Sequence, residues 1–495
     1  MMSQSQFFRN VLFFLIGVTS LSCLHAQSGF VFKYSTPNDE WPNDLIETSD
    51  GGFIVSISSG TYNSNYNTLL IRLSVYGDTI NTKLLWSSGG YCILSKIIKL
   101  DNGTFTGIGY KKELSGNQKI WLLTFDDSLN IIRDSLYATT NLFHFTNSNY
   151  GFIDVFRHLV VYAGAYEADS IFNIHTLVIN FNQNGDLLSS HYYSASGAQY
   201  PFSMCEKSDT SGYFLLIFGE YQVHTNTFSQ ILTLDNTWRI INIDSIPGSL
   251  TLYLNSKTLN NKELLITGKK YFENNPTRTD KIGILKLDST FQIKKEFFLG
   301  PDDTVSYPAY NTNMDYLNVQ NIFVGGLVNQ DYGGNFSYNL SYIILGKFDS
   351  SLNLKWQKYF GGDTYYMVWS VIATSDGGCI IGASTNDYAT MGEERDVYIL
   401  KLDSNGLITG IPHPPSNTND KILIYPNPGN DMMYVENNLG ACSLFLYDLT
   451  GRTICSRELS DGRNLIDVKL LKPGLYLYKL LQNSEIKQAG KWIKQ

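Results

Sequence analysis

Apolar residues recur along the chain in short alternating runs closed by polar turns, a pattern typical of β-strands. Seven of these runs end in an equivalent apolar residue, and successive members of the set are 52 to 61 residues apart: Leu73, Phe125, Phe181, Leu234, Leu287, Phe348 and Leu402. Such regular spacing indicates an internal repeat. We therefore expect seven units of one architecture.

Each unit predicts four short antiparallel strands. The first hairpin turn is marked by Asp50-Gly51 in one unit and Asn102-Gly103 in the next, pairs that accept the positive φ of tight hairpins. Asn184-Gly185 and Asn405-Gly406 mark the later turn into an amphipathic fourth strand. The turns have drifted in the third and fourth units, so the architecture is predicted more firmly than the number of units.

Four-stranded units of this length predict the blades of a propeller, so the fold class is all-β, with a seven-bladed β-propeller over residues 27–410. An open solenoid is disfavoured because its coils are shorter. The seventh unit lacks a clear fourth strand, whereas residues 30–34 resemble a fourth strand without a blade. We predict that residues 30–34 complete the seventh sheet and close the ring.

The first 26 residues have the pattern of a secretory signal peptide: a basic Arg9, an apolar run over 11–18 and a small residue, Ala26, before the cut. A lipoprotein signal at Cys23 is the weaker alternative because the expected leading aliphatic residue is missing. No later run approaches the roughly 20 apolar residues of a membrane-spanning helix. We expect export through the periplasm.

The cysteines do not suggest a disulfide framework. Cys92, Cys205 and Cys379 lie far apart in strand patterns, while Cys442 and Cys455 fall on two arms of one predicted hairpin. A turn near residues 449–450 would place Leu444 opposite Cys455, which disfavours a bridge without excluding it.

Composition narrows the class of protein. Of 495 residues only 17% are charged and 14% are aromatic, and the net charge is −8. Disordered chains are richer in charge and poorer in aromatics. Because the chain is acidic and has no basic run, we expect no nucleic-acid partner.

A Pro-rich linker at residues 411–420 separates the repeats from a module at 421–495, whose short alternating strands predict a small Ig-like β-sandwich. Its landmarks follow one another in order: Tyr425, Pro426, Asn427, Pro428, Asp448, Gly451, Arg452, Pro473, Gly474 and Tyr476. The module resembles the type A C-terminal sorting domain of the type IX secretion system. That resemblance implies contact with the secretion machinery and a secreted or cell-surface location.

Units with a Ser-Asp-Gly-Gly hairpin, at residues 49–52 and 375–378, resemble secreted propellers of bacterial surface proteins. No linear motif for a catalytic nucleophile, a phosphate loop or a metal helix is present, so we expect no cofactor. Histidines concentrate in the third and fourth units, and we consider His144, His158, His175 and His191 as possible metal ligands, with ordinary sheet positions as the alternative.

Loop aromatics are the remaining candidates, because Tyr and Trp stack on sugar rings and anchor protein contacts, although they also fill gaps between blades. The set is Trp41, Tyr62, Tyr66, Tyr310, Tyr332, Tyr365, Tyr366 and Tyr388, with the long loop of residues 330–341 expected to vary most. As ligand contacts we single out Tyr332, Tyr365 and Tyr366.

Three functions remain open from the sequence: a binding or adhesion module for protein or glycan, a glycan-active hydrolase or lyase with its site in the funnel, and a passive structural module. The fold alone does not choose among them.

Overall fold

The computed structural model describes most of the chain between residues 29 and 494. The described ranges are 29–61, 65–87, 90–112, 118–137, 143–167, 170–193, 198–220, 227–246, 250, 252–259, 263–272, 279–330, 339–386, 394–408, 423–425, 429–437, 440–448, 451–482 and 485–494. The predicted signal peptide and the Pro-rich linker lie outside these ranges.

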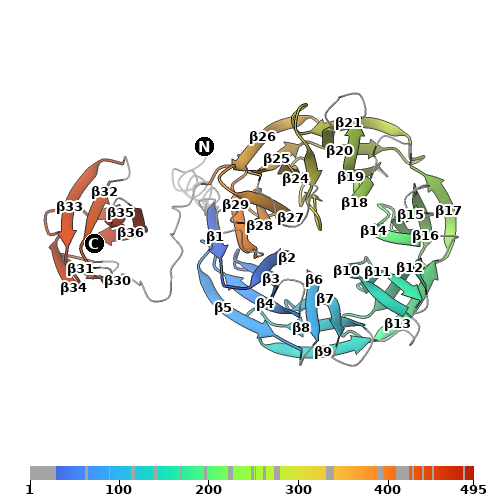
Figure 1. Ribbon diagram of the computed structural model, residues 1–495, viewed down its shortest axis with the longest axis horizontal. Coiled ribbons are helices and arrows are strands. Elements are labelled where there is room, and N and C mark those ends of the chain that lie inside the picture. The colour runs from blue at the N-terminus through green and yellow to red at the C-terminus, as the bar shows by residue number, and fades with distance from the viewer. Residues whose placement is uncertain are drawn as a thin grey trace, which may run out of the picture.

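Seven antiparallel sheets surround a central axis, with first strands innermost and fourth strands at the rim (Figure 1). The seven-bladed propeller is thus confirmed. Blade 1 comprises β2 (Asp39–Glu47), β3 (Phe53–Gly60), β4 (Tyr66–Leu73) and β5 (Thr79–Leu85). Blade 2 comprises β6 (Tyr91–Lys99), β7 (Phe105–Lys112), β8 (Lys119–Phe125) and β9 (Ile131–Tyr137). Blade 3 comprises β10 (Phe143–Ile153), β11 (Leu159–Glu167), β12 (Ser170–Phe181) and β13 (Leu187–Tyr193).

The remaining blades follow the same order, except that the first strand of blade 6 is split in two. Blade 4 comprises β14 (Ala198–Glu206), β15 (Gly212–Glu220), β16 (Thr227–Asp235) and β17 (Ile240–Ser245), and blade 5 comprises β18 (Leu252–Leu259), β19 (Glu263–Phe272), β20 (Thr279–Leu287) and β21 (Ile293–Leu299). Blade 6 comprises β22 (Ser306–Pro308), β23 (Met314–Asp315), β24 (Ile322–Val328), β25 (Tyr342–Phe348) and β26 (Leu354–Gly361). Blade 7 comprises β27 (Tyr365–Ala373), β28 (Cys379–Asn386), β29 (Asp396–Leu402) and β1 (Phe30–Tyr34).

The seven apolar residues that define the repeat occupy one equivalent position in the blades. Each lies at or beside the end of the third strand and is fully buried. Leu73, for example, lies opposite Phe53 at the start of β3, and Leu402 lies opposite Cys379 at the start of β28. The repeat therefore reflects a core position that every blade needs.

The first strand that the structure describes closes the ring, as predicted. β1 pairs antiparallel with β29, from Phe30 opposite Lys401 to Tyr34 opposite Val397. The Phe30 ring is buried and fills the space beside Gly77. Its centroid lies 5.9 Å from the centroid of the Phe53 ring. The N-terminal strand thus joins blade 7 to the core of blade 1.

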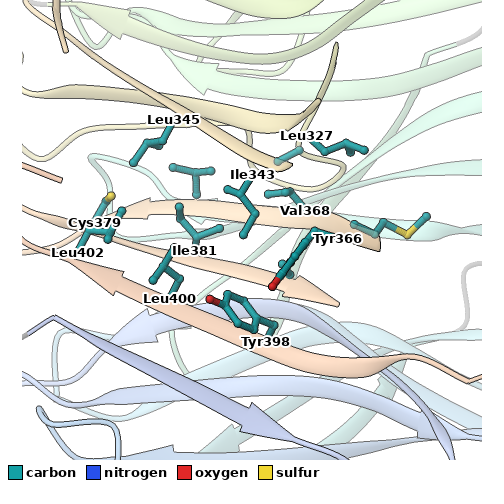
Figure 2. Close-up of a cluster of buried hydrophobic side chains, with 14 of the residues drawn as sticks. Leu327, Ile343, Leu345, Tyr366, Val368, Cys379, Ile381, Tyr398, Leu400 and Leu402 are labelled. Carbon is teal, nitrogen blue, oxygen red and sulfur yellow. The ribbon is translucent and has the colours of Figure 1, made fainter. Parts of the chain in front are cut away.

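Between adjacent blades lie seven clusters of buried apolar side chains within the described part of the chain, one at each junction. Figure 2 shows the cluster between blades 6 and 7, where Leu327, Ile343 and Leu345 of blade 6 face Val368 and Ile381 of blade 7. Burial of apolar surface at these junctions holds the blades together.

Tyr365 and Tyr366 belong to that same cluster, which corrects their assignment as ligand contacts. Their exposed fractions are 1% and 2%, and Tyr366 points into the packed side chains in Figure 2. Both residues begin the innermost strand β27, directly after a loop, and the sequence analysis therefore assigned them to that loop. Tyr332 lies outside the described residues.

The C-terminal module has two sheets with a shared core, as expected of a β-sandwich. One sheet has the order β30 (Leu423–Tyr425), β31 (Met432–Asn437), β34 (Gly462–Asp467); the other has β33 (Thr453–Leu459), β32 (Cys442–Tyr447), β35 (Gly474–Gln482), β36 (Glu485–Lys494). Met433 and Ile466 of the first sheet pack with Leu444, Tyr478 and Trp492 of the second. No apolar helix of membrane-spanning length occurs in the part of the chain that the structure describes.

The register of the β32–β33 hairpin differs from the predicted one. Cys455 lies opposite Leu446 rather than Leu444, and Cys442 lies opposite Leu459. A register shift between Leu446 and Tyr447 accompanies this difference, and the Arg452 amide donates to the Asp448 carboxylate at 3.1 Å across the turn. Both thiols are free.

Candidate functional site

The first strands that line the centre of the ring are irregular in every blade. Six of them carry a β-bulge, and in blade 6 residues 309–313 separate β22 from β23. A bulge re-aims the side chain of its extra residue. In blade 1 that residue is Asn43, and in blade 7 it is Trp369.

Four aromatic side chains from three neighbouring blades form what we call the aromatic arc. Trp41 of blade 1 stacks on Trp369 of blade 7 with ring centroids 6.0 Å apart. Trp369 lies 5.4 Å from Tyr310, which lies 5.2 Å from Tyr307, both in blade 6. All four are half-buried. The arc is therefore a continuous row of rings along the first strands of blades 1 and 7 and the interrupted first strand of blade 6.

Backbone pairing fixes the contact between blades 6 and 7. The amides of Tyr310 and Asn311 donate to the carbonyls of Val368 and Trp369, at 3.1 and 2.8 Å. The residues that interrupt the first strand of blade 6 thus lie along the first strand of blade 7. This pairing holds Tyr310 beside Trp369.

Hydrogen bonds also fix both indole rings. The Nε1 of Trp41 donates to Asn43 at 3.1 Å, and Asn43 in turn donates to Ser58 at 2.9 Å. The Nε1 of Trp369 donates to Ser384 at 2.9 Å. Because the N–H groups are bound within the protein, the rings are pre-organised surfaces, and a ligand that contacts them loses little affinity to ordering side chains.

A buried ion pair supports one end of the arc. Nε and Nη2 of Arg395 donate to the two carboxylate oxygens of Asp39, both at 2.7 Å. The guanidinium carbon lies 4.3 Å from the centre of the Trp41 ring, a cation–π distance. The pair joins blade 7 to blade 1, and Asp39 also accepts the Tyr66 hydroxyl at 2.9 Å.

A second ion pair lies at the other end of the arc, in blade 5. Lys269 Nζ is 3.5 Å from the buried Asp280 carboxylate and 5.4 Å from the centre of the Tyr307 ring. Each end of the arc therefore has one cation paired with one buried carboxylate.

Glu40 follows Asp39 and is fully buried. Its carboxylate accepts hydrogen bonds from the Thr36 amide and the Ser59 hydroxyl, each at 3.2 Å. Burial, together with a smaller effect of the negative charge of Asp396, raises the pKa of Glu40 from 4.5 to about 7, although the hydrogen bonds from Thr36 and Ser59 act to lower it. The backbone N–H of Glu40 donates to the Arg395 carbonyl at 2.8 Å, so Glu40 also helps to place Arg395.

The predicted histidines do not come together in the described residues. His158 lies in the turn after β10 with its Nδ1 3.4 Å from Asp154. His191 is on β13, where its ring stacks 5.9 Å from Trp238, and burial lowers its pKa. His175 lies on β12 opposite Ala165; the His144 side chain is outside the described part. Among described residues, no group of three metal-ligating side chains occurs.

Of the loop aromatics predicted from the sequence, Trp41, Tyr66 and Tyr310 lie in or beside the arc, while Tyr62 and Tyr388 are outside the described residues. The sequence missed Trp369 and Arg395. Trp369 lies within an apolar run typical of a core strand, and Arg395 falls in an acidic and basic stretch typical of a solvated loop. The chemistry that the arc offers is ring stacking and hydrogen bonding.

The sorting landmarks of the C-terminal module have structural roles where they are described. Gly451 has a φ of 82°, and Arg452 Nε donates to Asp448 at 3.0 Å across the same turn. The Tyr476 hydroxyl donates to the Lys472 carbonyl at 2.8 Å, which fixes the segment containing Pro473 and Gly474. Tyr425 ends β30, and Pro426, Asn427 and Pro428 lie outside the described residues.

Comparison with known families identifies this C-terminal module. Residues 423–495 match the family described as the secretion system C-terminal sorting domain. This match agrees with the landmarks read from the sequence and indicates delivery by type IX secretion to the outer surface or beyond. A search of curated proteins finds no match.

Solved structures with a similar fold include several propellers of distant sequence. An α-L-arabinofuranosidase of Fusarium graminearum matches with 10% identity and a TM-score of 0.43, covering 63% of this chain and 93% of its own. A Dyadobacter fermentans protein of unknown function has 10% identity, a TM-score of 0.41 and coverage of 76% and 98%. A subtype N10 neuraminidase-like protein from a little yellow-shouldered bat isolate has 10% identity, a TM-score of 0.36 and coverage of 62% and 91%.

Proposed function

We propose that this exported propeller, delivered to the cell surface or beyond by its sorting domain, is a glycan-binding module. The observation that carries the proposal is the aromatic arc, in which Trp41 and Trp369 stack on each other beside the Arg395–Asp39 ion pair. Ligand sites combine apolar and aromatic walls with a few fixed polar groups. The arc has this composition.

The arc favours a glycan over a protein ligand for a chemical reason. A sugar ring has C–H groups on its faces, which stack on aromatic rings, and hydroxyl groups at its edge, which hydrogen-bond to polar side chains. The half-buried rings of the arc supply the first kind of contact. The Tyr310 and Tyr307 hydroxyls and the Lys269 ammonium group supply donors for the second.

The test is to screen the secreted protein on a glycan array and to measure affinity for the best ligand by calorimetry. Trp41→Ala and Trp369→Ala should each weaken binding by about tenfold or more, as expected for a central aromatic contact. Trp86→Ala is the matched control, because Trp86 is 67% exposed and outside the arc. Binding that is equal in all four proteins would refute the proposal.

Glu40 supports a second candidate, a glycan hydrolase, because a carboxyl with a pKa near 7 is suited to general acid catalysis. Its full burial argues against direct contact with a substrate. Incubating the protein with the bound glycan and measuring the release of reducing ends distinguishes the two functions. Product formation that is lost in Glu40→Gln would favour the hydrolase.

A further inference from the structure

The aromatic arc extends over more of the molecule than a single sugar ring would need. Its rings run from blade 1 through blade 7 to blade 6, and Lys269 continues it into blade 5. These contacts connect the first strands of blades 1 and 7, the interrupted first strand of blade 6 and the second strand of blade 5. A ligand in contact with the whole arc therefore lies across three blade junctions.

The frame under the arc is rigid. Trp41 and Trp369 are fixed by hydrogen bonds from their ring N–H groups, and Tyr310 is fixed by backbone pairing to β27. In addition, Gln330 donates to the Tyr310 hydroxyl at 2.9 Å. Contacts at one end of the arc are thus held at constant distance from contacts at the other, which favours a ligand that makes several of them at once.

The charges along the arc balance. Arg395 is paired with Asp39, and Lys269 is paired with Asp280, and both carboxylates are buried. Glu40 and Asp396 add acidic groups near the Arg395 end. An anionic ligand would therefore meet no unpaired cation in the side chains described here, and the negative charge of the half-buried Asp396 lies near one end of the arc.

We propose that the arc binds a neutral linear oligosaccharide along its length, with consecutive sugar residues on Trp41, Trp369, Tyr310 and Tyr307. This inference rests on the proposed glycan-binding function and adds the ligand class: an internal stretch of an uncharged chain, rather than a single terminal sugar or an acidic polymer.

Oligosaccharide ladders test the length requirement on the unmodified protein. Cello-, xylo- and malto-oligosaccharides of one to six residues serve as neutral probes, and oligogalacturonides of the same lengths serve as acidic ones. For the neutral series that binds, we expect affinity to rise by about tenfold or more from one residue to four and then to level off once the arc is filled. Acidic chains should bind more weakly at equal length.

Tyr307→Ala locates the far end of the arc. It should weaken binding of the longest neutral chain while leaving that of the disaccharide unchanged, whereas Trp41→Ala should weaken both. If Tyr307→Ala strongly lowers the Tm, the dependence of affinity on chain length in the unmodified protein is the test of the extended site.

The outcomes separate this inference from the function on which it rests. Affinity that is independent of chain length but sensitive to Trp41→Ala would overturn the extended site and leave glycan binding intact. Tighter binding of oligogalacturonides than of every neutral chain would overturn the neutral class. Absence of binding to every ladder would overturn the extended neutral site, whereas the glycan array decides the binding function itself.

Discussion

At the scale of single residues, Glu40 connects the ring closure to the arc. Its carboxylate contacts Thr36, just after β1, and Ser59 on β3, and its backbone holds Arg395. The residue is buried without a cation bonded to its carboxylate in the described structure, which explains why burial raises its pKa to about 7. Its protonation state therefore affects the stability of this junction.

We expect the wild-type protein to lose stability as the pH rises from about 5 to about 8, and we expect Glu40→Gln to lose less over the same range. Below the ordinary pKa of 4.5 the carboxyl is protonated in the folded and the unfolded chain. Between 4.5 and about 7 only the folded chain keeps the proton, so the contribution of Glu40 to stability declines as pH rises and is lost through about pH 7. Gln resembles the protonated form and removes this dependence.

The measurement is the Tm of the wild-type protein and the variant across that pH range. Glu296→Gln, at an exposed carboxyl on the rim strand β21, is the control and should follow the wild type. Parallel pH profiles for wild type and Glu40→Gln would show that the raised pKa is wrong.

At the scale of the strand, β1 makes blade 7 complete. It pairs only with β29 in the described structure, and its buried Phe30 reaches the core cluster between blades 7 and 1. The closure therefore depends both on backbone hydrogen bonds and on the packing of one aromatic ring.

Phe30→Ala should lower stability by about 3 kcal/mol, the usual cost of removing a buried Phe side chain. Deleting residues 30–34 should cost more, because it also leaves β29 as an unpaired sheet edge. Both effects are measured as a fall in Tm. Leu84→Ala, at a residue 58% exposed on the rim strand β5, should leave the Tm unchanged. An unchanged Tm after the deletion would mean that the six complete blades hold the ring without its closing strand.

At the scale of the whole molecule, propeller and sorting domain each have their own sheets and their own buried core within the described residues. Separate cores are the usual sign of domains that fold independently. The route of export and the binding surface thus belong to different parts of the chain.

Deleting residues 421–495 should leave the protein in the periplasm with its propeller folded. Cell fractionation and surface labelling measure the location, and the Tm and glycan affinity of the purified truncation measure the fold. The full-length chain is the control. Normal display of the truncated protein at the surface would contradict the sorting role of this domain.

The repeat was predictable because it reflects a need common to all blades, namely one buried residue at the end of each third strand. The turns that follow were predictable only in part. Gly185 and Gly406 were expected in these turns, and both have a positive φ there. In other blades a large apolar residue takes the same backbone conformation, at Leu129, Trp238, Phe291 and Leu352. These side chains are buried, which offsets the cost of about 1 kcal/mol for a left-handed residue.

The arc was predictable only in pieces. Trp41, Tyr66 and Tyr310 were candidates because they adjoin loops. The contacts of Trp41 and Tyr310 with Trp369 depend on two bulges and on the pairing of residues 310–312 with β27. A bulge shifts the alternation of a strand by one residue, and nothing in the local sequence marks it. Tyr365 and Tyr366 were misassigned because the sequence does not locate the first buried residue of the strand.

The order β1-β29-β28-β27 has a mechanical consequence. The chain leaves the propeller from β29, so a pull on the tail during passage through the outer membrane would load this strand first. Because β29 has a neighbour on each side, two ladders of backbone hydrogen bonds must break before this strand can leave the sheet. Without β1, only the ladder between β29 and β28 would resist the pull.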